Sequence, residues 1–213
     1  MNSSVALFFI SNVVAAVLLG GKFVRKSDPV FKYFGWGLLF DALAFAMWTI
    51  GYMNSGQLLN FITYGAVAFL ISLIIFFYAS LQRAQTSTRL LMTVLGAAVI
   101  IGIFFVGRYS ANFAFISPEG FLFFNLTPMV QMLYIFALAF TTIPLIDMVA
   151  SKFEAPYSAL VRYGFIAQIV GGIMLITNMD VQVLYITGWI IGIVYLVLWT
   201  TLLFGSKAWP RNS

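Results

Sequence analysis

The chain has 213 residues, of which 62% are hydrophobic and 8% are charged, and its formal net charge is +5. A chain of this composition has too little polar surface to cover a soluble globule, which excludes an ordinary soluble domain and indicates a membrane protein. The basic residues are spread over short connecting segments, where they set membrane topology and meet anionic lipid headgroups. The positive charge therefore does not predict binding to nucleic acid.

Seven apolar segments follow one another along the chain, and each is close to the ~20 residues needed to cross ~30 Å of hydrocarbon. They cover residues 5–24, 33–53, 58–80, 90–107, 128–150, 157–177 and 182–204. The connections between them are too short to fold into a second domain. We therefore predict an all-α polytopic membrane protein, in which seven transmembrane helices form a single domain over residues 1–213.

Ten of the eleven basic residues lie in or beside alternate connections between these segments or in the tail after the last one. They are Lys22, Arg25, Lys26, Lys32, Arg83, Arg89, Lys152, Arg162, Lys207 and Arg211, whereas Arg108 lies in the other set of connections. Short loops rich in lysine and arginine stay on the cytoplasmic side of a membrane. This asymmetry predicts that the N-terminus lies outside and that the C-terminus lies in the cytoplasm.

The longest connection, Arg108–Thr127, lies on the predicted outer side and contains five phenylalanines. A loop this apolar is expected to lie in the membrane interface or to fold over the helix bundle. We favour a packed interfacial hairpin, and a cap over an outward-facing cavity is the alternative. Pro128 suits the first turn of the next helix, where a missing N–H group has no cost.

Two short sequence similarities suggest an internal repeat. Phe34-Gly35-Trp36 opens the second segment much as Tyr163-Gly164-Phe165 opens the sixth. Ile62-Thr63-Tyr64-Gly65 in the third segment resembles Tyr185-Ile186-Thr187-Gly188 in the seventh. The first three and the last three segments also run in the same directions, which suits a 3+1+3 parallel repeat of the kind found in some transporters and seven-helix receptors.

The sequence contains no histidine and no cysteine, so the commonest general base and the usual ligands of zinc and haem are missing. Glycine-rich phosphate loops, nucleophile elbows and metalloprotease signatures are absent as well. A retinal protein needs a lysine in its last helix to form the Schiff base, and segment 182–204 contains none. We therefore expect no enzyme activity, no metal, no cofactor and no retinal.

Asp41 lies well inside the second apolar segment, about 12 Å from its cytoplasmic end at ~1.5 Å per residue. A charged carboxylate at this depth costs at least ~2.5 kcal/mol, so Asp41 is expected to face the bundle interior. Trp48 and Tyr52 follow it on the same helix face, and Gln168 lies at a similar depth in segment 157–177. These four residues are candidates for a ligand or proton site. The structural alternative is a protonated Asp41 that is hydrogen-bonded to a neighbouring helix, with Gln168 as its partner.

The second helix ends in Trp48-Thr49-Ile50-Gly51-Tyr52, after Ala42–Ala46, and the third contains Tyr64-Gly65. In these features the first three helices, about a third of the chain, resemble the seven-helix sensory module at the N-terminus of many bacterial and archaeal membrane histidine kinases. The resemblance implies sensing of a signal or small ligand in the membrane, with output through attached cytoplasmic domains. Because no segment follows Ser213, it also implies that a separate protein carries the response.

These observations favour a non-catalytic integral membrane module, in a prokaryotic cytoplasmic membrane, that acts as a sensor-like or accessory subunit of a membrane complex. Its expected partners are membrane lipids and a membrane or cytoplasmic protein. The alternative is a small-solute or proton-coupled transporter with Asp41 at the midplane, which the parallel repeat favours. A transporter needs a continuous polar route, however, and the inner halves of the third, fourth and seventh segments offer almost no polar residues.

The predicted topology can be tested by labelling single cysteines, since the natural chain contains none. A cysteine at Ser87 should react with a membrane-impermeant maleimide only from the cytoplasmic side, and one at Ser117 only from outside, because the basic loops stay inside. The measurement is labelling of intact cells and of inverted vesicles. Reversed labelling at either position would show that the number of segments is wrong.

Overall fold

The computed structural model describes residues 3–108, 113–155 and 157–177 of the chain. It contains the helices α1 (Ser3–Val24), α2 (Pro29–Met53), α3 (Leu58–Ser80), α4 (Thr86–Arg108), α5 (Pro128–Ala150) and α6 (Tyr157–Thr177), the 3₁₀ turn η1 (Ser55–Gln57), and the strands β1 (Ala114–Ile116) and β2 (Leu122–Phe124). The structure is mostly helical, and its six helices coincide with the first six predicted segments. The seventh predicted helix, 182–204, and its share of the proposed repeat lie outside the described residues.

Helices α2 and α4 begin four residues earlier than the apolar pattern predicted, and for α2 the reason is a capping residue. Asp28 precedes the helix in an extended conformation, and its carboxylate accepts hydrogen bonds from the N–H groups of Val30 (2.8 Å) and Phe31 (3.4 Å). Pro29 occupies the first turn, where no backbone donor is needed. The cap satisfies donors that the helix leaves unpaired, so the helix extends beyond its apolar segment.

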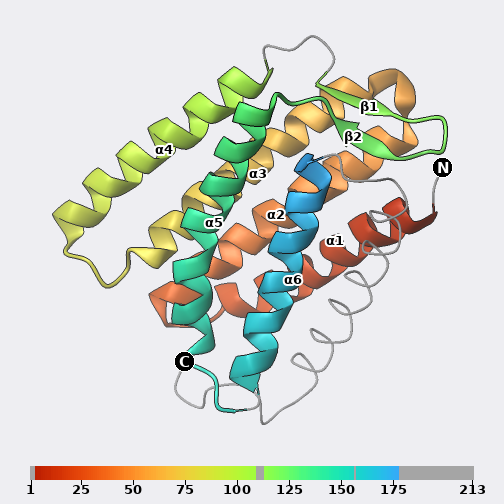
Figure 1. Ribbon diagram of the computed structural model, residues 1–213. Coiled ribbons are helices and arrows are strands. Elements are labelled where there is room, and N and C mark those ends of the chain that lie inside the picture. The colour runs from red at the N-terminus through yellow and green to blue at the C-terminus, as the bar shows by residue number, and fades with distance from the viewer. Residues whose placement is uncertain (1–2, 109–112, 156, 178–213) are drawn as a thin grey trace.

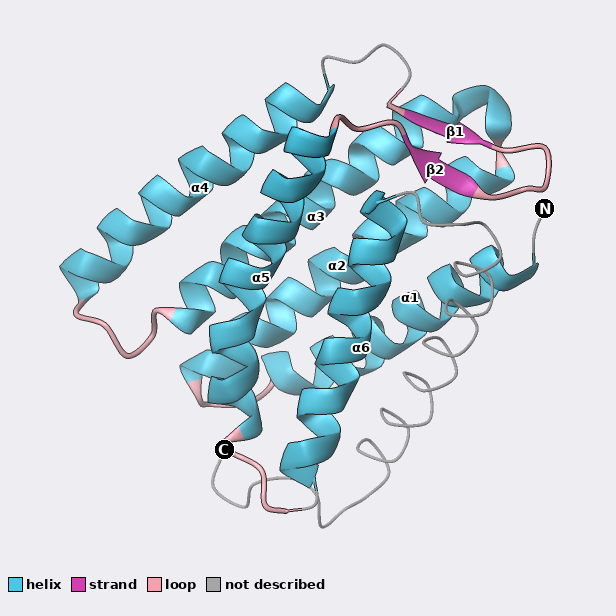
Figure 2. Cartoon of the chain, viewed as in Figure 1, coloured by secondary structure: helices cyan, strands magenta, loops and turns pink. Residues whose placement is uncertain are grey.

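Successive helices run in opposite directions, so the connections lie alternately at the two ends of the bundle (Figure 1). The start of α1, the α2–α3 connection and the two strands lie at one end, and the other three helix–helix connections lie at the opposite end (Figure 2). Eight basic residues lie in or beside these three connections: Lys22, Arg25, Lys26, Lys32, Arg83, Arg89, Lys152 and Arg162. We call the end of the bundle that contains these three connections the basic end. Helix α2 packs along both α1 and α3, and α3 also packs against α4 and α5.

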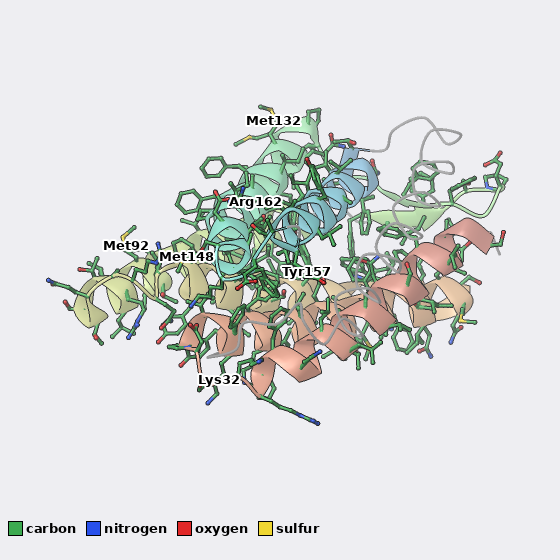
Figure 3. All side chains as sticks on the ribbon, turned by 90° about the horizontal axis from the view of Figure 1, so that it is seen from below. Lys32, Met92, Met132, Met148, Tyr157 and Arg162 are labelled. Atoms are coloured by element: carbon green, nitrogen blue, oxygen red, sulfur yellow. The ribbon has the colours of Figure 1, made fainter. Side chains whose placement is uncertain are left out.

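Five of the described helices, α1 to α5, are long and apolar enough to cross a membrane, judged by length and composition. Their outer surfaces carry large apolar side chains that contact little else in the chain: Met132 is 72% exposed and Leu90 is 64% exposed. Figure 3 shows Met92 and Met132 pointing away from the bundle. An apolar surface of this extent is unusual for a soluble monomer and is what lipid covers in an integral membrane protein.

The connection between α4 and α5 contains a short antiparallel hairpin, which is the part of the described secondary structure that is not helical. The paired residues are Ala114 with Phe124, Phe115 with Phe123, and Ile116 with Leu122. Gly120 lies in the turn with a positive φ of 83°, which glycine adopts without strain. Pairing satisfies the backbone N–H and C=O groups of a segment that is too apolar to remain in water. Ala114 and Leu122 are buried against α1, α2 and α3, so the hairpin packs on the bundle. Its predicted position in the membrane interface stays a prediction.

Tyr52, at the end of α2 that lies away from the basic end, holds this hairpin on the bundle. Its hydroxyl group donates a hydrogen bond to the carbonyl oxygen of Gly120. The Tyr52 side chain is buried and meets the ring of Phe9 edge-on, with the ring centroids 6.5 Å apart. This residue, one of the sequence-predicted site candidates, therefore connects α1, α2 and the hairpin.

Tyr52→Phe should loosen the hairpin without unfolding the bundle, because it removes the hydroxyl group that bonds to Gly120 and keeps the buried ring. We expect a loss of about 1 kcal/mol in the free energy of unfolding and faster cleavage beside the exposed Glu119 by a glutamate-specific protease. Tyr64→Phe, at a tyrosine of α3 that is 59% exposed, is the matched control and should change neither quantity. Equal cleavage of the two variants in detergent would contradict the proposed contact.

Candidate functional site

Asp41 lies in the middle of α2 and faces the bundle interior, as predicted, with only 1% of its surface exposed. It lines a cavity of about 50 Å³ between α2, α3, α5 and α6, which we call the inner cavity. One water needs roughly 10–15 Å³ of such space, so the inner cavity has room for a few waters beside the carboxyl group. Thr142 of α5 is the other polar residue among those that line it.

Thr142 presents an acceptor to the inner cavity. Its hydroxyl group donates a hydrogen bond to the carbonyl oxygen of Leu138 in its own helix (2.5 Å), which uses the only hydrogen of the hydroxyl. The oxygen keeps its lone pairs, so it can accept a hydrogen bond from a water or from a protonated carboxyl group. Among the described residues, no lysine or arginine lines this cavity. The arrangement therefore suits water or a proton beside Asp41 better than an anionic ligand.

Ser72 of α3 lies at the same depth as Asp41. The two helices are antiparallel and the backbone of Gly37 contacts the ring of Phe76, a register that sets Ser72 opposite Asp41. Ser72 is 0% exposed, and its hydroxyl oxygen has no hydrogen-bond partner in the described part of the chain. A buried hydroxyl group without a partner is unfavourable by about 1–3 kcal/mol. Asp41, Ser72 and Thr142 thus lie at one depth in the bundle, and we call them the polar layer. Close packing of the helices does not by itself explain polar residues at this depth.

Ser72 and Thr142 were missed by the sequence analysis, although a signal was present. Each lies eight residues from the predicted cytoplasmic end of its apolar segment, as Asp41 does. At ~1.5 Å per residue this places all three about 12 Å from the same end of their helices. Measuring depth from the basic end in every segment would have identified the polar layer.

The aromatic side chains that follow Asp41 along α2 are buried, as their shared helix face predicts. The rings of Phe45 and Trp48 meet edge to face with centroids 5.1 Å apart, and both contact the ring of Phe9 in α1. The indole nitrogen Nε1 of Trp48 donates a hydrogen bond to the carbonyl oxygen of Ile62 in α3 (3.2 Å). Trp48 is therefore fixed by contacts with two neighbouring helices and forms a rigid wall.

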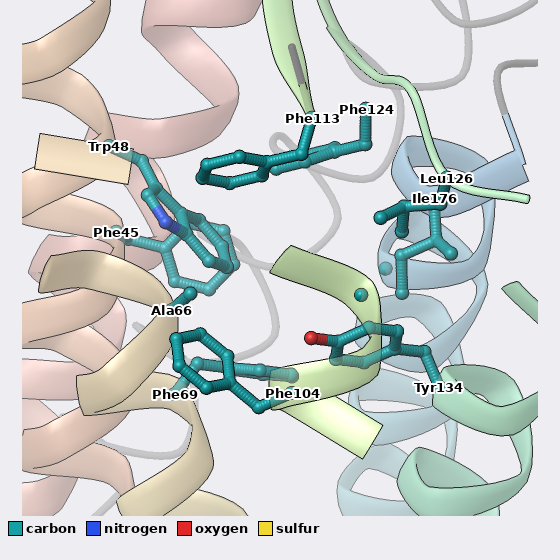
Figure 4. Close-up of a pocket in the computed structure, with 12 residues that line it drawn as sticks. Phe45, Trp48, Ala66, Phe69, Phe104, Phe113, Phe124, Leu126, Tyr134 and Ile176 are labelled. Carbon is teal, nitrogen blue, oxygen red and sulfur yellow. The ribbon is translucent and has the colours of Figure 1, made fainter. Parts of the chain in front are cut away.

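A second cavity, of about 80 Å³, lies between this aromatic wall and the hairpin segment (Figure 4), and we call it the outer cavity. Phe113 and Phe124 line it from the hairpin side, so the connection both packs over the bundle and covers a cavity. Phe45, Phe69 and Gly172 line both the outer and the inner cavity. The two cavities therefore adjoin, and they differ in chemistry because Asp41 and Thr142 line only the inner one.

Gln168 belongs to α6, but its side chain lies outside the described part of the structure. The pairing of Asp41 with Gln168 therefore stays a prediction. Within the described residues, no three histidine, cysteine, aspartate or glutamate side chains are grouped so that they could hold a metal ion.

No protein-family model matches the chain, and neither a curated protein nor a solved structure matches it. The class of the protein therefore follows from its own features, which are a helical bundle with several helices able to span a membrane and two adjoining internal cavities. The resemblance of its first three helices to the sensory module of histidine kinases stays a prediction.

Gly65→Ala should disturb the wall formed by Trp48. A Cβ at position 65 would lie 2.3 Å from two atoms of the Trp48 ring and 2.9 Å from the carbonyl oxygen of Ala44. We expect destabilisation by about 1–3 kcal/mol, measured as a lower melting temperature in detergent. The control is Gly102→Ala in α4, where an added Cβ meets nothing within 4 Å. That variant should be neutral or slightly more stable, since alanine favours helix. Equal melting of both variants would refute the tight contact.

Proposed function

We propose that the protein is a non-catalytic, sensor-like or accessory subunit of a membrane complex, which acts through partner proteins. In this proposal it forms a seven-helix bundle in a prokaryotic cytoplasmic membrane, with the N-terminus outside and the C-terminus in the cytoplasm. The observation that carries the proposal is the position of α2, which lines both cavities and is tied to another part of the chain at each of its ends.

At the basic end, an ion pair ties α2 to the connection between α5 and α6. Asp28, the N-cap of α2, pairs with Lys152, whose ammonium group also lies 5.4 Å from the centre of the Phe31 ring. Partial burial raises the pKa of Asp28, but the hydrogen bond and charge of Lys152 and the capped N–H groups lower it more, so the net shift is downward. The pair is therefore intact at neutral pH, and its contribution to stability is lost only as the pH falls through the lowered pKa.

Helix α2 thus connects the hairpin contact of Tyr52, both cavities and the ion pair of Asp28 along a single rigid element. Occupancy of either cavity would act on a helix that also holds a connection at the basic end. The eight basic residues at that end attract anionic lipid headgroups and an acidic surface of a partner protein. This arrangement supports communication with a separate protein.

The proton-coupled or small-solute transporter is the second candidate, and the polar layer favours it. Asp41 is buried beside an acceptor and a cavity with room for water, as a proton site requires. Against it, the outer cavity has an almost wholly apolar lining, so the described residues offer no continuous polar route from Asp41 to the outer end. A transporter needs such a route, and we therefore rank it second.

The proposed function is tested by purifying the protein from its native membrane in mild detergent, which should recover a partner protein in a fixed ratio. Arg83→Glu, at an exposed position of the basic end, should reduce recovery of the partner because it repels an acidic surface. Gln57→Glu places a negative charge at an exposed position of the opposite end and should leave recovery unchanged. Isolation of the protein alone, or solute uptake by liposomes that contain only this protein, would overturn the proposal.

Substitutions of Asp41 separate the two candidate functions. Asp41→Asn keeps hydrogen-bonding groups at the polar layer and should melt like the parent, whereas Asp41→Leu should lose about 0.6–2 kcal/mol of stability. A structural acid tolerates asparagine, so Asp41→Asn should retain partner recovery. The measurements are melting temperature, partner recovery and solute uptake in liposomes. A variant that melts like the parent but loses an uptake activity of the parent would make the transporter the better candidate.

A further inference from the structure

The outer cavity is larger than a single-water void and lies where the helices meet the hairpin segment. Its volume of about 80 Å³ is several times the roughly 10–15 Å³ that one water occupies on this scale. Close-packed protein interiors contain few voids larger than a water molecule. The lining comes from α2 to α6 and from the hairpin segment, so the cavity lies where all of these elements meet (Figure 4).

The lining determines which molecules the outer cavity can accept. Aromatic rings surround it, among them Trp48, Phe104 and Phe113, and none of the described residues that line it is charged. An ion or a zwitterion would lose its hydration there without a compensating partner, at a cost of several kcal/mol. Flat apolar groups gain contact with the ring faces and edges instead. The cavity therefore selects a neutral molecule that dissolves in the membrane.

Among the described lining residues, Tyr134 directs a polar group into this cavity. Figure 4 shows the hydroxyl group of Tyr134 directed from α5 into the space beside Phe69 and Phe104. The described structure contains no hydrogen bond from this hydroxyl, although tyrosine hydroxyls within a protein usually find a partner. Gly107 lies beside it, where even a Cβ would be only 3.4 Å from the hydroxyl oxygen. Tyr134 thus supplies a single hydrogen-bonding group to an otherwise apolar site.

We propose that the outer cavity binds a neutral, membrane-soluble aromatic molecule that carries one hydroxyl or carbonyl oxygen, with its ring between Trp48 and Phe104 and its oxygen hydrogen-bonded to Tyr134. This inference gives the proposed sensor-like module a ligand class, and its biological meaning rests on that proposed function. The binding itself requires no partner protein. A bare hydrocarbon, such as a lipid acyl chain, would fill the cavity without using Tyr134.

The test compares two probes of nearly equal shape, 2-naphthol with one hydroxyl group and naphthalene with none. Binding to the purified full chain is measured by equilibrium dialysis of radiolabelled probe at a fixed detergent concentration. In Ala66→Leu, the longer side chain of a lining residue of α3 fills the cavity. Any probe that still associates with this variant is therefore dissolved in the detergent. Leu126→Phe fills the cavity from the hairpin side and serves the same purpose if Ala66→Leu fails to fold.

We expect saturable binding of one probe per chain that either filling variant abolishes, with 2-naphthol bound about fivefold more tightly than naphthalene. Tyr134→Phe should remove this preference and leave naphthalene binding unchanged, whereas the exposed control Tyr64→Phe should keep the preference. Binding that the filling variants do not reduce would overturn the site. Equal affinity for both probes in the parent would overturn the role of Tyr134 and indicate a site for a lipid chain.

The outcomes also separate this inference from the proposed function. Selective binding of 2-naphthol by a protein that is isolated without a partner would support the site and contradict the partner-based function. A partner recovered in a fixed ratio from a protein that binds neither probe would support the function and overturn the ligand class.

Discussion

Helices α1, α2 and α3 pack with their backbones almost in contact, and glycines make this approach feasible. A Cβ at Gly35 would lie 2.5 Å from the backbone nitrogen of Val24 in α1, and one at Gly37 would lie 2.3 Å from the ring of Phe76 in α3. Within a membrane the hydrophobic effect does not drive helices together, so close van der Waals contacts of this kind supply the association. The contacts fix α2 between its neighbours, and the hairpin, the polar layer and the ion pair of Asp28 all depend on that position.

The remaining helices are packed less closely, which explains where the cavities form. Of the most apolar stretch of α4 only 17% is buried, against 56% for α2, so α4 is held mainly by its contacts with α3 and α5. The outer cavity is lined by the closely packed α2 and α3 on one side and by α4, α5 and α6 on the other. Large aromatic side chains at this boundary cannot fill all of the space, because Trp48 is already fixed against Gly65.

Much of the fold could be predicted because it follows from properties of single segments. Length and apolarity identified the six described helices, and the cost of burying a charge placed Asp41 in the interior. The two strands of the hairpin were not predicted. Each has only three residues, too few to show a recognisable alternation of buried and exposed side chains. Ser72 and Thr142 could have been found from their depth in their own segments, which matches that of Asp41. The cavities themselves depend on the register between helices, which no single segment contains. The contact between Gly37 and Phe76 sets that register, but the two residues lie far apart in the sequence. Their contact could therefore not be identified from the sequence.

The residues that line both cavities determine whether a molecule in one cavity can affect the other. Phe45, Phe69 and Gly172 separate the polar layer from the outer cavity and provide no polar group through which an ion or a proton could pass. Packed side chains of this kind do adjust between discrete arrangements when one side of the wall is filled. A molecule in the outer cavity would therefore influence the surroundings of Asp41 through the position of these rings. Since Phe45 and Asp41 both belong to α2, the same adjustment would reach Asp28 and its ion pair at the basic end, which is the end that the proposed function assigns to contact with a partner.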